Sequence, residues 1–197
     1  MSIEATSSIW QANLGALHEL LETVAGMDDA VEAAARTIYE SLQGHGKLLC
    51  CGNGGSATDS SHLAAEIAGR FVIERSGWPA HDLTADHGLL TALINDYPPE
   101  QVFSRQLQAF GRAGDVLAAF STSGNSANVY EAIHAARSMD IRTIAFLGRD
   151  GGKCKGHADV EFVVPSDVTA RIQEIHKLLY HTLCEVLDPL LEQPRPR

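Results

Sequence analysis

Ten residues, FSTSGNSANV (120–129), gather several hydroxyl groups around a single glycine. Ser121, Thr122, Ser123 and Ser126 follow an apolar run and precede an amphipathic one. Hydroxyls and backbone N–H groups at the start of a helix can hold an anion such as a phosphate monoester. A Ser or Asn at such a junction more often acts only as a helix cap, but a cap needs one residue. The stretch therefore predicts a phosphate site.

A second polar turn, GNGGS (52–56), also follows a short apolar run. Neither turn contains the GK[ST] ending of a P-loop or the GxGxxG pattern, which disfavours nucleotide binding. In open parallel sheets, ligands gather beyond the carboxyl ends of the strands, where both turns are expected. The two turns are the first candidates for a ligand site.

Histidine and carboxylate side chains form a third group of candidates. His62 and Glu66 are four residues apart, which places both on one helix face, where they can bind a metal or form a surface pair. In the last predicted helix, Gln173, His176 and His181 interrupt an apolar pattern. Gln173 and His181 lie about 12 Å apart along the helix axis. The spacing leaves open whether His176 or His181 faces such a site.

Composition and charge limit the kinds of partner. The chain has 197 residues, 45% of them hydrophobic, enough for a sizeable core. A net charge of −10, with 15 scattered basic residues, argues against a nucleic-acid partner. No apolar run reaches the roughly 18 residues of a membrane span, and MSIEATSSIW lacks the features of a signal peptide. We expect a soluble, cytoplasmic protein with no membrane partner.

The four cysteines, Cys50, Cys51, Cys154 and Cys184, show no metal-binding spacing. Two of them are adjacent in a predicted strand, where they cannot easily face one partner. We expect all four to be reduced and mostly buried thiols.

The elements that must position these residues follow from apolar periodicity. Helical spacing predicts helices over 3–24, 30–42, 56–70, 86–95, 100–110, 126–138, 151–157 and 169–191. Short apolar runs predict strands over 48–52, 81–84, 115–121, 142–148 and 160–164. Their alternation indicates an α/β fold with a parallel sheet covered on both faces. We expect one domain over 1–197, with N-terminal helices (1–43), a parallel α/β core (44–191) and a frayed tail (192–197).

The first predicted helix carries an apolar stripe of Trp10, Leu14, Leu17 and Leu21. Such a stripe can pack against another subunit or within the same chain. The pattern leaves both possibilities open.

Several motifs occur in order between about residues 10 and 190: GNGGS, SHLAAE, FSRQ (103–106), STSGNSANV, DGGK (150–153) and RIQEIH (171–176). Together they resemble the phosphoheptose isomerases of the sugar isomerase (SIS) domain family. The resemblance implies a three-layer SIS sandwich with a five-stranded parallel sheet, assembled as a homotetramer with active sites at subunit interfaces. It also implies conversion of D-sedoheptulose 7-phosphate to D-glycero-D-manno-heptose 7-phosphate, the first step towards the heptose of lipopolysaccharide or related glycans.

The resemblance also assigns roles to residues. The implied ligands of one zinc ion per subunit are His62, Glu66, Gln173 and His181, which selects His181 over His176. The implied phosphate contacts are Ser121, Thr122, Ser123 and Ser126. The implied contacts to the rest of the substrate are Asn53, Gly54, Gly55, Ser56, Asp96 and Gln173.

The implied reaction suits these residue types. A ketose becomes an aldose through an enediol, which calls for two acid–base groups. Glu66 can take the carbon-bound proton, and His181 can move protons on the other side. A divalent ion would polarise the carbonyl and stabilise the enediolate. Because a carboxylate held by a metal is a weaker base, Glu66 is expected to loosen its contact when substrate arrives.

The chain departs from the family pattern at one position, and two alternative functions compete with this interpretation. Part of the family carries aspartate where this chain has Ala170, so a contact to the sugar is expected to be lost or moved. Some relatives are non-catalytic SIS tetramers that bind the replication initiator protein, but they lack the metal-site residues that this chain retains. A regulatory SIS domain that senses a sugar phosphate would normally accompany a DNA-binding segment, and none fits in this length.

Overall fold

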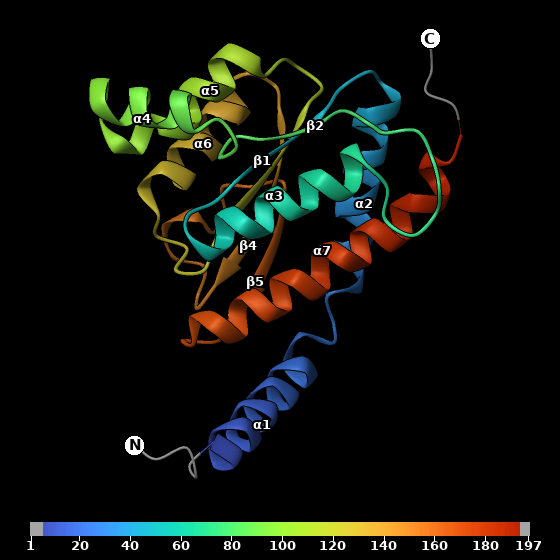
Figure 1. Cartoon of the computed structure of the whole chain (residues 1–197), viewed down its shortest axis with the longest axis vertical. Helices are drawn as coiled ribbons and strands as arrows, with labels where there is room; N and C mark the ends of the chain where they lie inside the picture. The colour runs from blue at the N-terminus through green and yellow to red at the C-terminus, as the bar shows by residue number, and fades with distance from the viewer. Residues whose placement is uncertain (1–5, 194–197) are drawn as a thin grey trace.

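The computed structural model describes residues 6–193 and shows a five-stranded sheet between two helical layers (Figure 1). The strand order is β2-β1-β3-β4-β5, and every pair of neighbours is parallel. The strands are β1 (Leu48–Cys51), β2 (Ala80–Asp82), β3 (Val116–Ser121), β4 (Arg142–Gly148) and β5 (Val160–Val164). The predicted α/β class and five parallel strands are confirmed.

The helices follow the predicted order with two changes. They are α1 (Thr6–Val24), α2 (Asp28–Gln43), α3 (Gly55–Ala68), α4 (His87–Asp96), α5 (Val102–Phe110), α6 (Ala127–Ser138) and α7 (Thr169–Leu191), with the 3₁₀ turn η2 at Pro99–Gln101. Helix α3 ends two residues earlier than predicted. The predicted helix over 151–157 is wrong, because only the 3₁₀ turn η3 (Gly152–Cys154) forms there. Gly151, Gly152 and Gly156 have positive φ, which a right-handed helix cannot accommodate.

The two layers take alternate residues of the central strands. Leu48 and Cys50 pack in a core with α2, α3 and α7, whereas Leu49 and Cys51 pack in a core with α5 and α6. All four cysteines are buried and free, as predicted. No helix of the described residues is long and apolar enough to cross a membrane.

The carboxyl ends of the strands bring both polar turns to one edge of the sheet. Strands β1 and β3 are neighbours, and Cys51 is in register with Ala119. The GNGGS turn leaves β1 at this level, and the hydroxyl-rich turn leaves β3 two residues further on. The predicted proximity of the two turns is thus a consequence of strand order.

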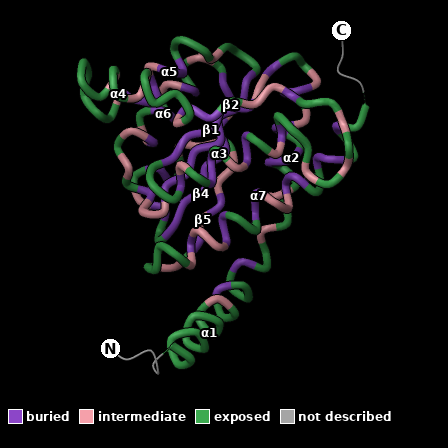
Figure 2. The backbone as a smooth tube through the Cα atoms, viewed as in Figure 1, coloured by how far each residue is buried: buried purple, intermediate pink, exposed green. Residues whose placement is uncertain are grey.

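Helix α1 projects from the body of the molecule, with its surface largely open (Figures 1 and 2). Trp10 is 58% exposed, and Leu14 and Leu21 are also exposed. Only Leu20 and Val24 of this helix are buried. Most of the apolar stripe is therefore left uncovered by the described part of the chain.

His176, on the inner face of α7, is fully buried. Its Nε2–H donates to the Leu147 carbonyl at 3.1 Å, whereas Nδ1 has no partner among the described residues. The rings of Phe120 and Phe146 meet it edge-on. Burial lowers the pKa of His176 from 6.5 to about 4, so the side chain is neutral in the folded protein.

This imidazole makes the free energy of unfolding depend on pH. Because its pKa is lower in the folded state, its contribution is complete above pH 6.5 and is lost as the pH falls towards 4. The difference between the unfolded-state and folded-state pKa values corresponds to about 3 kcal/mol of unfolding free energy. Between about pH 7 and pH 4.5, wild type should lose about 2 to 3 kcal/mol more than His176→Gln in urea unfolding. Equal losses would contradict the assignment.

Candidate active site

The turn between β3 and α6 keeps its hydroxyls largely free of helix capping. Ser126 is the N-cap of α6, but its side chain makes no capping hydrogen bond. Ser121 is buried and its hydroxyl donates to Ser126 Oγ at 3.0 Å, while Ser123 Oγ accepts from Asn125 N at 3.1 Å. Gly124 takes a left-handed φ of 64° at the centre. The excess of hydroxyls is consistent with a ligand rather than with a cap alone.

The DGGK segment supports this turn from behind. A Cβ on Gly124 would lie 2.1 Å from the Gly151 carbonyl oxygen, so only glycine allows this approach. Cys154 N donates to the Gly124 carbonyl at 2.9 Å, and Lys153 N donates to Asn125 Oδ1 at 3.1 Å. The turn is therefore preorganised by contacts outside it.

A pair of asparagines joins the two polar turns. Asn53 of the GNGGS turn and Asn128 in the first turn of α6 exchange two side-chain hydrogen bonds, both of 2.9 Å. Gly54, with φ of 57°, and Gly55 form the start of α3, and Ser56 is buried beside them. Sequence reasoning missed Asn128, although an Asn two residues after the candidate turn was a usable signal.

Helices α3 and α7 lie side by side and run in the same direction (Figure 1). At the start of α3, a Cβ on Gly55 would lie 2.2 Å from Gln173 Nε2, so the glutamine amide rests on the glycine backbone. Two turns further along both helices, Tyr180 Oη and His62 Nδ1 are 3.0 Å apart. The residues of both pairs are separated by the same number of positions in the sequence, so α3 and α7 keep a constant register along this stretch.

This pairing brings three of the four predicted metal ligands to one place. His62 Nε2 lies 2.8 Å from Glu66 Oε1, and the rings of His62 and His181 are 5.0 Å apart between centroids. Gln173 instead lies two turns earlier on α7, about 12 Å along the axis. Within residues 6–193, no three His, Cys, Asp or Glu side chains form a group that could hold a metal ion. Binding of one zinc ion by all four residues stays a prediction.

The hydrogen bonds of His62 nevertheless fit a cation. Burial raises the pKa of Tyr180 well above 10, so its hydroxyl is neutral and donates to Asp59 Oδ1 at 3.4 Å. His62 Nδ1 and the Tyr180 oxygen are 3.0 Å apart, and in the tautomer in which Nδ1–H donates to that oxygen, the lone pair of Nε2 is directed at Glu66. In that tautomer two acceptors face each other at 2.8 Å, which requires a cation or a further proton between them. Imidazole and carboxylate groups with such outer hydrogen bonds are suitable zinc ligands.

His181 contacts the ring of His62 and the ring of Phe71. Burial, followed by the nearby His62 and Lys177, lowers the pKa of His181, and these effects outweigh the opposing carboxylates. Phe71 packs on His181 with ring centroids 5.6 Å apart. The neutral imidazole that this environment favours can accept a proton or bind a metal.

The structure does not bring Asp96 to the other candidates within one chain. Asp96 ends α4, a helix with no buried residue, and accepts a hydrogen bond from Asn95. Among the described residues, no contact joins it to either polar turn. Ala170 is exposed in the first turn of α7 and supplies no polar group.

The sequence matches known families over most of its length. Residues 14–148 match the SIS domain model. The chain is 46% identical to the phosphoheptose isomerase of Helicobacter pylori (strain ATCC 700392 / 26695) over 90% of this chain and 91% of the relative.

Solved structures give the same similarity. A phosphoheptose isomerase from Neisseria gonorrhoeae superposes with a TM-score of 0.86 at 42% identity, over 93% of this chain and 99% of that chain. One from Francisella tularensis also has a TM-score of 0.86, at 33% identity, over 96% of this chain and 99% of that chain.

Proposed function

The chain belongs to the phosphoheptose isomerases of the SIS domain family, and we propose that it converts D-sedoheptulose 7-phosphate to D-glycero-D-manno-heptose 7-phosphate at the site described above. The observation that carries the proposal is the arrangement along α3. Its amino end meets the hydroxyl-rich turn through Asn53 and Asn128, and its far half carries His62 and Glu66 beside His181. An anion site and an acid–base site thus lie at two positions along one helix.

The separation of these positions suits an extended sugar phosphate. At 1.5 Å per residue, His62 and Glu66 lie about 10 and 16 Å along α3 from Gly55. With the phosphate on Ser121, Thr122, Ser123 and Ser126, the carbonyl end of the substrate can reach Glu66 and His181. Asn53, Gly54, Gly55, Ser56 and Gln173 lie between them and are proposed to contact the sugar.

Glu66 and His181 are proposed to transfer the protons. Glu66 takes a proton from C1 of the ketose, an enediol forms, and a proton returns to C2. His181 moves a proton between the two oxygen atoms of the enediol. Zinc held by His62, Glu66, Gln173 and His181 would polarise the carbonyl and stabilise negative charge on the enediolate. Glu66 is proposed to loosen its contact with the metal as substrate binds, because a carboxylate held by a metal is a weaker base.

A homotetramer with sites at subunit interfaces is the proposed assembly. An apolar groove of about 490 Å³ lies between α1, α2 and α7, lined in part by Leu21, Met27, Val31, Leu178 and Val186. Together with the exposed stripe of α1, it offers a surface for another subunit. Asp96 could then contact the sugar of a neighbouring site, which would also account for its position away from the local turns.

A cytoplasmic enzyme that supplies heptose for lipopolysaccharide or a related glycan fits this substrate class. The non-catalytic scaffold that binds the replication initiator protein finds no support among the relatives described above, which are named isomerases.

The test is incubation of the zinc-loaded protein with sedoheptulose 7-phosphate, with the aldose detected through its anomeric proton by NMR. The proposal expects the aldose to accumulate to an equilibrium ratio that does not depend on enzyme concentration. A protein that binds zinc and this sugar phosphate without forming aldose would instead support the sensing domain.

The phosphate assignment predicts that Ser123→Ala raises KM more than it lowers kcat. Loss of one protein hydroxyl that hydrogen-bonds to a charged ligand weakens binding by about 1.5 to 3 kcal/mol, so KM should rise about tenfold or more. Initial rates over a range of substrate concentrations give both constants. Ser138→Ala is the matched control, because among the described residues the Ser138 hydroxyl donates only to the Ala135 carbonyl, at the far end of α6. An unchanged KM in Ser123→Ala would remove the phosphate assignment.

A further inference from the structure

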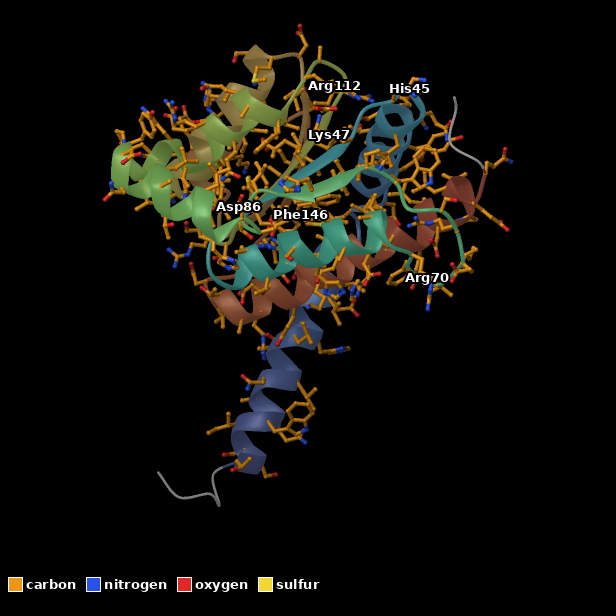
Figure 3. The ribbon with its side chains drawn as sticks, turned by 45° about the horizontal axis from the view of Figure 1, so that its top comes forward. His45, Lys47, Arg70, Asp86, Arg112 and Phe146 are labelled. Carbon is orange, nitrogen blue, oxygen red and sulfur yellow. The ribbon has the colours of Figure 1, made fainter. Side chains whose placement is uncertain are left out.

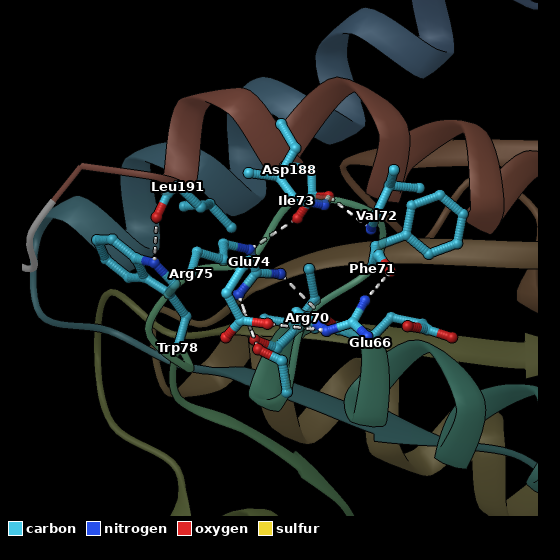
Figure 4. A network of polar contacts seen from close by, with 12 residues as sticks. Glu66, Arg70, Phe71, Val72, Ile73, Glu74, Arg75, Trp78, Asp188 and Leu191 are labelled. Atoms are coloured by element: carbon cyan, nitrogen blue, oxygen red, sulfur yellow. Dashed lines mark hydrogen bonds and ion pairs between the residues drawn. The ribbon is translucent and has the colours of Figure 1, made fainter.

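The connection between α3 and β2, residues 69–79, contains no helix or strand and is held against the end of α7 (Figure 4). At its centre, Arg75 pairs with Asp188 of α7, with Nε and Oδ1 2.8 Å apart. The two side chains are only 1% and 3% exposed. A buried ion pair of this kind persists only with good geometry and further hydrogen bonds, and both partners have them.

The guanidinium of Arg75 closes the end of α3. Nη2 donates to the carbonyl of Glu66 at 2.9 Å, and Nη1 lies 3.2 Å from the carbonyls of Ile67 and Gly69. Carbonyls in the last turn of a helix lack intrahelical partners, and a cation there also complements the helix dipole. Arg75 therefore contacts the backbone of the residue assigned as the catalytic base.

Asp188 holds the other side of the connection. Its Oδ2 accepts from the backbone N–H groups of Val72 and Ile73, at 2.7 and 2.6 Å. Trp78 adds a hydrogen bond from Nε1 to the Leu191 carbonyl at 2.9 Å. The connection is thus attached to the last turns of α7 at several points.

We propose that the Arg75–Asp188 pair is a positioning element for the acid–base site, an inference that rests on the function proposed above. Glu66 and His181 lie on different helices, and their separation depends on how α3 and α7 sit against each other. The pair links the carbonyl of Glu66 to α7 seven residues beyond His181, which is about two helical turns on the same face. The connection that it anchors also carries Phe71, which packs on His181.

A small displacement at this point should affect chemistry more than substrate binding. A misplacement of about 1 Å can cost about 100-fold in rate, because reacting groups must be aligned. The phosphate turn lies at the opposite end of α3 and makes no contact with residues 69–79 among the described residues. Loss of the pair should therefore lower kcat and weaken zinc binding while KM stays nearly constant.

The experiment compares Asp188→Asn with Asp115→Asn, a matched control for the loss of a buried carboxylate. Asp115 is fully buried and accepts from the backbone N–H groups of Lys47 and Arg112, at 3.0 and 2.9 Å, and from Lys47 Nζ at 2.5 Å. Lys47 and Arg112 lie together near the start of β3 (Figure 3). Arg70, which follows the end of α3 in the connection held by Asp188, lies apart from them. Both variants should lower Tm, but only Asp188→Asn should alter the acid–base site.

For Asp188→Asn we expect kcat to fall by about 10- to 100-fold, KM to change less than about twofold, and zinc affinity to fall by about 10- to 100-fold. Zinc affinity is measured by competition with a chromophoric chelator. In the metal-free protein, the His181 Cε1–H resonance should also shift, because the ring of Phe71 moves. Asp115→Asn should leave all of these values unchanged.

If Asp188→Asn fails to fold, the double variant Arg75→Met with Asp188→Leu replaces the pair with apolar groups, a change that buried ion pairs often tolerate. It should show the same loss of kcat and zinc affinity. Unchanged kcat, zinc affinity and His181 resonance in the folded variant would overturn the proposal, as would equal losses in Asp115→Asn. If wild type makes no aldose, the proposed function fails, whereas zinc affinity and the resonance still decide the positioning role.

Discussion

Replacement of Glu66 by glutamine is expected to lower kcat by about 1,000-fold while KM changes only a few-fold. Glutamine has nearly the same shape and can still contact His62 through its amide, but it cannot take a proton from carbon at neutral pH. General base catalysis contributes about 10²- to 10⁴-fold in enzymes, so loss of the base should remove most of the turnover. The measurement is the initial rate of aldose formation at saturating substrate with zinc present.

Glu74→Gln provides the control for this change. Glu74 lies in the connection after α3, its side chain is 89% exposed, and its ion pair with Arg70 is a surface contact of little energetic weight. Its substitution should leave kcat within about twofold. A Glu66→Gln enzyme that retains more than about a tenth of wild-type kcat would exclude Glu66 as the base.

Removal of the metal is expected to lower kcat by at least about 100-fold, and addition of zinc should restore it. Polarisation of the carbonyl and stabilisation of the enediolate are worth several kcal/mol, and each 1.36 kcal/mol corresponds to a tenfold change in rate. Protein dialysed against a chelator, then against buffer, is assayed before and after addition of one zinc equivalent per chain. Protein dialysed without chelator is the control.

His62→Ala connects this result to the site. Without the imidazole, the contact with Glu66 is lost, and zinc should no longer restore activity to the chelated protein. Full activity in metal-free wild type would show that a proton, rather than a cation, lies between His62 Nε2 and Glu66 Oε1.

The fold was predictable because the relevant signals are local. Strand and helix periods change sharply along the chain, and the fully buried run of β3 has the continuous apolar pattern of a central parallel strand. A parallel sheet then places both polar turns at the carboxyl ends of the strands. The error at 151–157 has a local cause as well, because the glycines that prevent a helix there also allow the close approach to Gly124.

The arrangement between helices was beyond sequence reasoning. Nothing local to α3 or α7 fixes their relative register, which depends on contacts such as that between Gly55 and Gln173. The spacing of Gln173 and His181 by about two turns was evident from the sequence, but the sequence could not show that His181 lies beside His62. Only the family resemblance selected His181 over His176, which the structure places fully buried against β3 and β4.

The supporting residues were missed for a similar reason. Arg75 and Asp188 are far apart in sequence, and single charged residues in a loop and a helix are usually solvated. In the sequence, Tyr180 fits the apolar pattern of α7, yet in the structure its hydroxyl contacts His62. Such roles arise from tertiary contacts and leave no motif.

The most direct test of the central claim is conversion of sedoheptulose 7-phosphate by the zinc-loaded protein in D₂O, followed by NMR. Isomerisation through an enediol predicts that the aldose appears and that at least part of it carries deuterium at C2, because the proton held by Glu66 can exchange with solvent. Absence of aldose from a protein with zinc bound would contradict the isomerase assignment. Aldose that still carries no deuterium at C2 after many forward and reverse turnovers at equilibrium would indicate a hydride shift and contradict the proton-transfer roles of Glu66 and His181.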